Sequence, residues 1–526
     1  MTEPNPAAGR PPEEPPPGRA HAEPPRGRPP AETPPGRPPA EPHLRPAALS
    51  PGTCRLLAVA SWLDGDPIPL DLLSGPANPA GPPDPAELSS LAAAGLLGNR
   101  PDGRLTLPEA TRREIHDVLG GAGRDLALGI LRNHLGEPGS PGETARCLAV
   151  LPHLTRWTAL TRPEDDTPDG ANLLARVVVL LLDNQMGSAA LPLAERVART
   201  AEMHMGPDSP KTLSVRANLA SVYDQAGEHL RGARLLEKVI AARTVQLGPD
   251  HPDVWEAWNN LGGIYLTLGQ YEKATQTVEG VLAHRTEVLG PTHRLTLMAR
   301  NNLAVIARRA GRRDEAVALW EAVLPEFEAA LGQDDKDTIV VRASLYRARR
   351  DHDDTDRTDD LTELEERIAR FAVSSPEPTR EAVAALVERA TALRDQGRHQ
   401  EAVTAFREAV ARGRTALGPG HPLMVSAGYR MAYALEAGGD ADTALAAAEE
   451  ALAEADRSLG RTHYETLMAA VSVLSLLLRR DRLSDHQNLL EARLADIIEG
   501  LGFGHPLVRA LAAHRASLAL NRPDWS

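Results

Sequence analysis

Glycines recur with a fixed period along the second two-thirds of the chain. One series falls at Gly206, Gly248, Gly290, Gly332, Gly418, Gly460 and Gly502, where all spacings are 42 residues except one of 86. A second series with the same spacings falls at Gly227, Gly269, Gly311, Gly397, Gly439 and then Asp481. Two interleaved series with one period predict a helix, a tight turn, a second helix and a longer turn, repeated. Such hairpins bury their apolar faces only by stacking, so we expect an all-α solenoid of about eight units over residues 170–520, ending in a partial capping helix.

The composition agrees with helix packing and excludes several classes of protein. Aromatic residues are only 3% of the chain, and Ala and Leu supply most of the apolar side chains. The net charge of −14 argues against a partner that is nucleic acid or an anionic membrane, because both attract a positive field. The longest apolar run, residues 177–182, is too short to span a bilayer, and the chain starts without a secretory signal. We therefore expect a cytoplasmic protein, and its Arg-rich composition suggests an actinobacterial genome.

Residues 1–47 form a separate segment with 17 of the 45 prolines. The string Gly-Arg-Pro-Pro begins at Gly9, Gly27 and Gly36, and there is almost nothing apolar to bury. Such a segment cannot offset its ordering entropy, which predicts a disordered, polyproline-rich tail. The tail could be a ligand for a proline-recognising domain or a passive spacer.

Residues 48–120 predict a small winged-helix module. The order is three helices, then two short strands around a Pro-Asp-Gly turn, then a helix that begins near Pro108. Residues 121–169 follow as a helical arm, divided by a Gly- and Pro-rich breaker at residues 137–142. The third helix of the module carries no Arg, Lys, Asn or Gln to read a base, and the basic residues nearby are few: Arg100, Arg104, Arg112 and Arg113.

The repeat unit resembles a known one. Residues 251–291 resemble the 42-residue tetratricopeptide repeats of kinesin light chain and its bacterial relatives. The resemblance is carried by Trp258, Leu261, Gly262 and Tyr265 on the first helix and by Ala274 on the second. It implies a right-handed superhelix with a concave groove, lined by the first helix of each unit, that holds an extended peptide.

The order of segments is also similar to the back half of actinobacterial signalling NTPases of the NB-ARC (STAND) class. In those chains a nucleotide-binding module precedes a winged helix, a helical arm and tetratricopeptide repeats. Here no Gly-Lys pair occurs anywhere, so a phosphate-binding GxxxxGK[ST] loop is missing. We therefore expect no bound nucleotide.

The resemblance places a row of amide side chains in the groove. Asn218, Asn260 and Asn302 stand 42 residues apart, Ser344 follows in phase, and Asn259 and Asn301 precede two of them. An Asn there can bond both the N–H and the C=O of a ligand backbone. The alternative is that these side chains bond locally within their hairpins.

A basic strip is expected beside the amide row. Arg308, Arg309, Arg347 and Arg350 cluster at the ends of two successive first helices, with Arg394 and Arg430 as an extension. Guanidinium groups pair with carboxylates, which would favour an acidic partner. The alternative is a solvated Arg-rich face.

Other candidate sites fail on their spacing. The acidic run of residues 351–366 lacks the Gly that a calcium loop needs, with Asp359 in its place. His251, His293, His421, His463 and His505 recur once per unit, too far apart to share a metal, and are interpreted as turn residues. No catalytic motif occurs, so we expect no enzyme activity, cofactor or metal.

The sequence thus predicts a non-catalytic scaffold or sensor that binds a protein or peptide. Two alternatives stay open. The chain could regulate transcription by contacting DNA through residues 48–120, or it could restore a signalling NTPase in trans as the partner of a nucleotide-binding protein.

Overall fold

The computed structural model describes most of the chain after the Pro-rich segment. The described residues are 49–63, 68–69, 84–99, 104–119, 123–140, 142–350, 366–367, 370, 379–461, 463–480, 482, 486–501 and 511. Outside them lie the expected tail, almost all of the acidic run, the short helix expected after Pro69, and all of the expected capping helix except residue 511.

The first described module combines helices with a small sheet. Its helices are α1 (Pro51–Trp62), α3 (Pro85–Ala93) and α4 (Glu109–Leu119). The expected hairpin is present: β2 (Gly98–Asn99) pairs antiparallel with β3 (Arg104–Thr106), and β1 (Ile68–Pro69) pairs with the other edge of β3. In the sheet order β1-β3-β2, β3 is the central strand, with β2 on one side and β1 on the other. Assignment of the module to the winged-helix class stays a prediction.

Arg112 fastens the last helix of this module to the first. Its side chain is only 1% exposed, and its guanidinium donates to the carbonyl oxygens of Ala60 (2.9 Å) and Leu63 at the end of α1. Carbonyl groups at a helix C-terminus lack the usual N–H partner four residues on, so a buried guanidinium supplies donors to them. Arg112 is therefore a structural residue and is not available to a phosphate.

The arm comprises α5 (Arg124–Leu135), α6 (Glu143–Leu160) and the short 3-10 helix η3 (Pro163–Asp165). It is joined to the repeats by a buried ion pair in which Arg196 Nη2 lies 2.6 Å from the carboxylate of Asp166. The same carboxylate accepts a hydrogen bond from Thr200 at 2.7 Å. A buried charge pair is tolerated only when its other hydrogen bonds are satisfied, as they are here.

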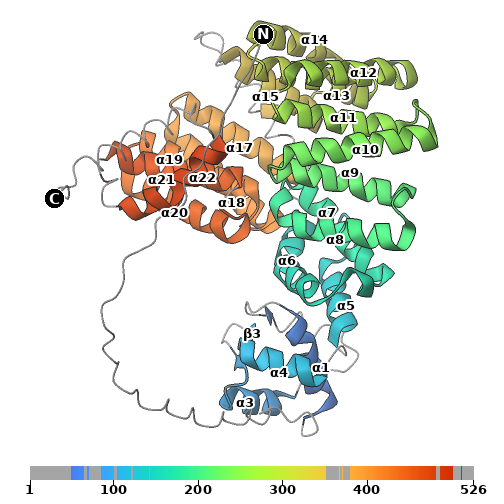
Figure 1. Ribbon diagram of the computed structural model, residues 1–526. Helices are drawn as coiled ribbons and strands as arrows, with labels where there is room; N and C mark the ends of the chain where they lie inside the picture. Colours follow the sequence, from blue (N-terminus) through green and yellow to red (C-terminus); the bar gives the residue numbers. More distant parts are fainter. Residues whose placement is uncertain are drawn as a thin grey trace, which may run out of the picture. The chain divides into compact units, whose positions relative to one another are not determined.

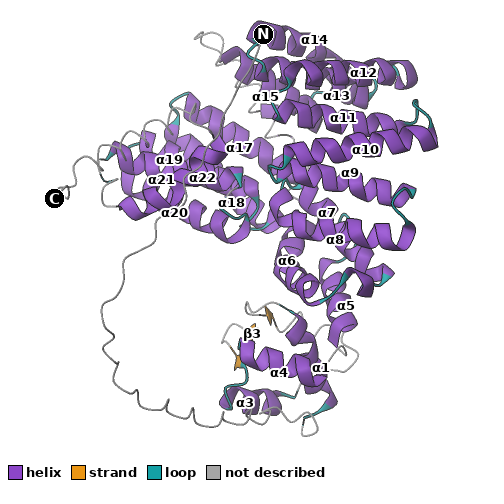
Figure 2. Cartoon of the chain, viewed as in Figure 1, coloured by secondary structure: helices purple, strands orange, loops and turns teal. Residues whose placement is uncertain are grey.

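The solenoid is a series of helical hairpins stacked in chain order (Figures 1 and 2). The first helices of the units are α7 (Pro168–Asp183), α9 (Pro210–Gln225), α11 (Pro252–Thr267), α13 (Arg294–Arg309), α15 (Lys336–Arg350), α17 (Arg380–Asp395), α19 (Pro422–Ala437) and α21 (Tyr464–Arg479). The second helices are α8 (Gly187–Met205), α10 (His229–Leu247), α12 (Tyr271–Leu289), α14 (Arg313–Leu331), α18 (His399–Leu417), α20 (Ala441–Ser458) and α22 (Gln487–Leu501). The predicted all-α solenoid is confirmed.

The periodic residues of the sequence begin and end these helices. Gly248, with φ 89°, ends α10 in a backbone conformation that only glycine adopts without strain. The in-phase histidines His251, His293, His421 and His463 are N-caps. In each, Nδ1 accepts the backbone N–H two residues on at 3.1 to 3.2 Å. Repetition of the cap explains why a histidine recurs in each of these turns.

Each unit buries its apolar face against the next. Leu261 and Ala257 of α11 pack with Leu236 and Val239 of α10 in one cluster, and Ala274 and Val278 of α12 pack in the following one. Small residues allow close helix approach: a Cβ at Gly262 would come within 2.9 Å of the Val278 side chain. The core therefore runs along the solenoid instead of forming one centre.

The start of the solenoid also contacts its later part. In the turn after α7, Asn184 Oδ1 lies 2.9 Å from His421 Nε2 in a buried hydrogen bond, and the carbonyl of Gln185 lies 3.3 Å from His463 Nε2. A second contact joins α6 and α18, where Leu148 lies beside Gly418. Gln185 is the one described non-glycine residue with a positive φ, of 60°. The N-cap residues His421 and His463 thus join units that are far apart in the sequence.

Candidate functional site

Successive first helices contact one another in several places (α7 with α9, α9 with α11, α15 with α17, α17 with α19 and α19 with α21), and residues of α9, α11 and α13 line one cavity. We therefore compare the in-phase position of each first helix as one row. The predicted amides stand at the same position of their helices, and the residues at that position in the eight first helices are Arg176, Asn218, Asn260, Asn302, Ser344, Glu388, Arg430 and Ser472. The row is thus amide in α9, α11 and α13 and changes character on both sides.

Outside the three amides, the residues of the row are paired within the protein or, in the case of Ser472, buried with an unpartnered Oγ. Arg176 Nε donates to Glu143 at 2.9 Å, and Ser344 donates to the Val340 carbonyl at 2.9 Å. Glu388 lies between two cations, 3.3 Å from Arg347 and 3.5 Å from Arg430. Ser472 is fully buried. Nothing is left over in these positions for a ligand backbone.

The amides at Asn218, Asn260 and Asn302 differ from the rest of the row. Each side chain is half-buried, and none of the three hydrogen bonds to any part of the chain that the structure describes. Asn301 behaves otherwise: it is 7% exposed, and its Oδ1 accepts from Trp320 Nε1 at 2.9 Å. Asn301 therefore packs inside its own repeat, which corrects the expectation that it faces the groove.

A cavity of about 310 Å³ opens in the same stretch of the row. Its polar lining comes from Asn259, Asn260 and Asn302, from Ser221, Asp224 and Gln225 at the end of α9, and from Gln185. Ile264, Leu266, Val278, Val305 and Ile306 supply its apolar lining. Gly263 lies at an open point of this lining, since a Cβ added there would meet nothing within 4 Å.

Two side-chain oxygens at this cavity are buried without a donor. Gln225 donates through Nε2 to the Leu182 carbonyl at 3.0 Å, so its Oε1 is the free end, and that oxygen is buried. Asn259 Oδ1 is also buried and receives no hydrogen bond. Most buried acceptors in folded proteins have a partner, so an unsatisfied pair in one cavity marks it as a candidate site.

The expected basic strip is largely balanced by carboxylates. Arg347 and Arg430 share Glu388, and Arg394 pairs with Asp395 at 2.6 Å. Arg309 is exposed at the end of α13, and Arg308 interacts with other parts of the protein. The Arg350 side chain lies outside the described structure. The strip therefore gives no strong positive field on this face, and the reason for expecting an acidic partner falls away.

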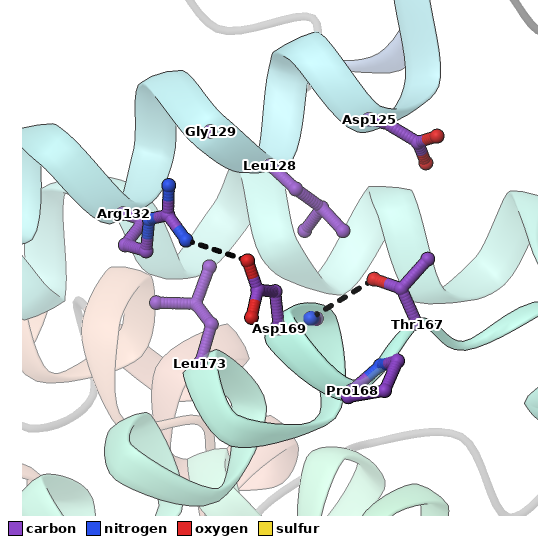
Figure 3. A pocket seen from close by; sticks show the side chains of 9 residues that line it. Asp125, Leu128, Gly129, Arg132, Thr167, Pro168, Asp169 and Leu173 are labelled. Carbon is purple, nitrogen blue, oxygen red and sulfur yellow. Dashed lines mark hydrogen bonds and ion pairs between the residues drawn. The ribbon is translucent and has the colours of Figure 1, made fainter.

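Two further cavities lie near the arm. One of about 350 Å³ separates α5 from the start of α7, and Figure 3 shows Arg132 and Asp169 pointing toward one another beside it, 2.9 Å apart. Its charges are thus paired, and Thr167 is occupied as the N-cap of α7. Another of about 700 Å³ lies among α7, α8 and α9, with an apolar lining that includes Val197 and Val215. Neither holds an unsatisfied polar group like those beside Asn260.

Sequence analysis missed part of the candidate site. Ser221, Asp224 and Gln225 lie one to two turns beyond Asn218 on the same helix, and Gly263 is in phase with Ser221. The signal was available, because positions three and seven residues along a helix share its face. The cavity itself has no signature in the sequence.

Comparison with known proteins identifies the repeat. Residues 255–325 and 381–453 match one family model of the tetratricopeptide repeat, and residues 218–286 match a second. The chain therefore carries tetratricopeptide repeats, which confirms the resemblance found in the sequence. The family models indicate no catalytic family, and a comparison with curated protein sequences gives no match. Within the described residues, no helix is both long and apolar enough to cross a membrane, and no three acidic, His or Cys side chains gather as a metal site.

Some solved structures of repeat proteins are similar to this chain at low identity. Nearly identical TPR-like repeats of a kinesin light chain from Podosopora anserina are 23% identical, cover 40% of this chain and 99% of that chain, and give a TM-score of 0.33. A STAND protein with a tetratricopeptide repeat sensor from Pyrococcus horikoshii is 12% identical (90% and 66% covered, TM-score 0.40). The quorum sensor NprR from B. thuringiensis, in its apo form, is 13% identical (67% and 97% covered, TM-score 0.42). These values are too low to indicate a function.

Proposed function

We propose that the chain is a non-catalytic scaffold or sensor that binds an extended segment of a partner protein across α9, α11 and α13. The observation that carries this is the row of Asn218, Asn260 and Asn302, whose amides have no partner in the described protein. A primary amide donates and accepts at once, so three in phase suit a peptide backbone of any sequence. The row is confined to the stretch that also holds the 310 Å³ cavity.

The test is the triple variant Asn218→Ala, Asn260→Ala, Asn302→Ala. Its binding of peptides from a random octapeptide library should fall by at least about tenfold, because each amide contributes roughly 0.5–1.5 kcal/mol of hydrogen bonding. Its thermal midpoint should stay that of the wild type, since these side chains bond to nothing in the fold. The matched control is Asn301→Ala, which should lower stability by about 1–3 kcal/mol, because it leaves Trp320 Nε1 unpaired.

A stability loss of more than about 3 kcal/mol in the triple variant would contradict the proposal, because it would show the amides to be part of a buried network. In that case the partner must use another face.

The DNA-binding alternative loses support from the first module. Of its few basic side chains, Arg112 is buried against α1, and Arg113 lies 3.4 Å from Glu109. Phosphate binding normally needs several free cations. Partnership with a nucleotide-binding protein is a special case of the proposed scaffold role and would use the same groove.

A further inference from the structure

The cavity beside Asn260 holds two buried acceptor oxygens that receive no hydrogen bond. Gln225 Oε1 and Asn259 Oδ1 are both buried with no donor, and the orientation of Gln225 is set by its bond to the Leu182 carbonyl. Removing an acceptor from water without a replacement donor is unfavourable. A ligand that brings N–H groups into the cavity would offer donors to these acceptors.

The charge of the cavity also favours a ligand group that donates hydrogen bonds and carries a positive charge. Among the described residues that line it, Asp224 is the one charged side chain, and there is no Arg or Lys. Its carboxylate lies 2.8 Å from His229 Nδ1, and burial raises the pKa of Asp224 above its ordinary value. A cation next to the carboxylate would favour its charged form.

The apolar lining sets the shape of the group that fits. Ile264, Val305 and Ile306 line the cavity, and Gly263 adds no side chain to it. A side chain with an aliphatic stem and a donor-rich, positively charged head matches both linings. A guanidinium has five N–H groups in a planar fork and is more weakly hydrated than an ammonium, so it can reach several separated acceptors at a lower desolvation cost.

We propose that this cavity takes an arginine side chain of the bound segment. The guanidinium donates to Gln225 Oε1 and Asn259 Oδ1 and faces Asp224, while the row of amides holds the neighbouring backbone. This inference rests on the proposed function and adds the chemistry of its partner: a segment with a positive side chain, opposite to the acidic one that the Arg strip suggested.

The experiment uses the full chain and a positional-scanning library of octapeptides, acetylated and amidated at their ends, with one position fixed at a time. We expect arginine to be retained at least tenfold better than norleucine at one position, with lysine and citrulline in between. The variants Gln225→Met and Asp224→Asn should each reduce this preference at least fivefold. The matched control, Ser344→Ala, should leave the preference unchanged because Ser344 lies outside the cavity.

A steric pair of variants tests the same cavity without removing a polar group. Gly263→Leu should abolish the arginine preference, because it adds a large side chain to a residue that lines the cavity. Gly129→Leu, at another helical glycine with open space around it, should not.

The outcomes separate this inference from the function on which it rests. Retention that depends on the amide row but shows no arginine preference, or a preference that survives Gln225→Met combined with Asp224→Asn, would overturn the arginine site alone. If the wild-type chain retains no peptide at all, the proposed function fails and the arginine site fails with it.

Discussion

The two halves of the solenoid are built from the same unit but present different surfaces. In α9, α11 and α13 the in-phase residue is asparagine without a partner among the described residues, whereas in α17 and α19 it is Glu388 and Arg430, which pair with one another. The helix caps of the two halves also use the same residue type but differ in burial. His251 caps α11 near the surface, while His421 caps α19 and is only 1% exposed. A repeat therefore preserves the fold while each copy is free to be used for binding or for internal contacts.

The difference follows from what lies opposite each half. The turn after α7 packs on the caps of α19 and α21, so polar groups there must find partners inside the protein. In α11 and α13 the in-phase amides are half-buried instead. Tertiary contact, and not the repeat pattern, decides which half can serve a ligand.

The largest effect expected from the difference between the two halves is a loss of stability at acidic pH. Burial, with Arg380 nearby, lowers the pKa of His421 to about 3 from 6.5. Between these values the unfolded chain binds a proton that the folded chain does not, so stability is complete above pH 6.5 and falls as pH drops. We expect a loss of about 1.4 kcal/mol per pH unit from this group, measured by urea unfolding.

The control for the acid response is His421→Asn, which keeps a capping side chain and has no proton to gain. The difference between wild type and variant should grow as pH falls from 6.5. An equal slope in both would mean that His421 is not the group responsible.

A smaller effect is expected from the paired half of the row. Glu388→Leu leaves Arg347 and Arg430 without their shared carboxylate, and we expect it to lower stability by about 1–3 kcal/mol in thermal or urea unfolding. The change Asn260→Leu, at the corresponding position of α11, should alter the free energy of unfolding by no more than about 0.5 kcal/mol, because no hydrogen bond within the described structure is lost. If both changes cost the same, the two halves do not differ as described.

The smallest effect compares two adjacent glycines of α11. Gly263→Ala should raise stability by about 0.5–1 kcal/mol, because alanine favours the helix and its Cβ meets nothing within 4 Å. Gly262→Ala should lower it, because its Cβ would come within 2.9 Å of Val278. The thermal midpoints of the two variants, each compared with that of the wild type, measure both effects. A higher midpoint for Gly262→Ala would show that the helices can move apart without a loss of stability.

The sequence by itself determined the architecture of this protein. Two glycine series with a 42-residue period predicted the hairpins and their turns, and the in-phase asparagines were found without any coordinates. These features are local: a left-handed turn needs glycine at one position, and a helix end needs a cap. The period also carried the order of the units, because neighbours in the chain are neighbours in space.

Only the tertiary structure decided how individual polar residues are used. Asn301 and Asn302 are adjacent and identical in the sequence, yet one bonds Trp320 and the other lines a cavity, because a helix turns about 100° per residue and directs them to different faces. Arg112 is buried against α1, and Arg347 and Arg430 meet over Glu388 from two different units. Such partners are set by packing between helices that are distant in the chain, so the free amides and the acceptors of the cavity emerge only after the solenoid has formed.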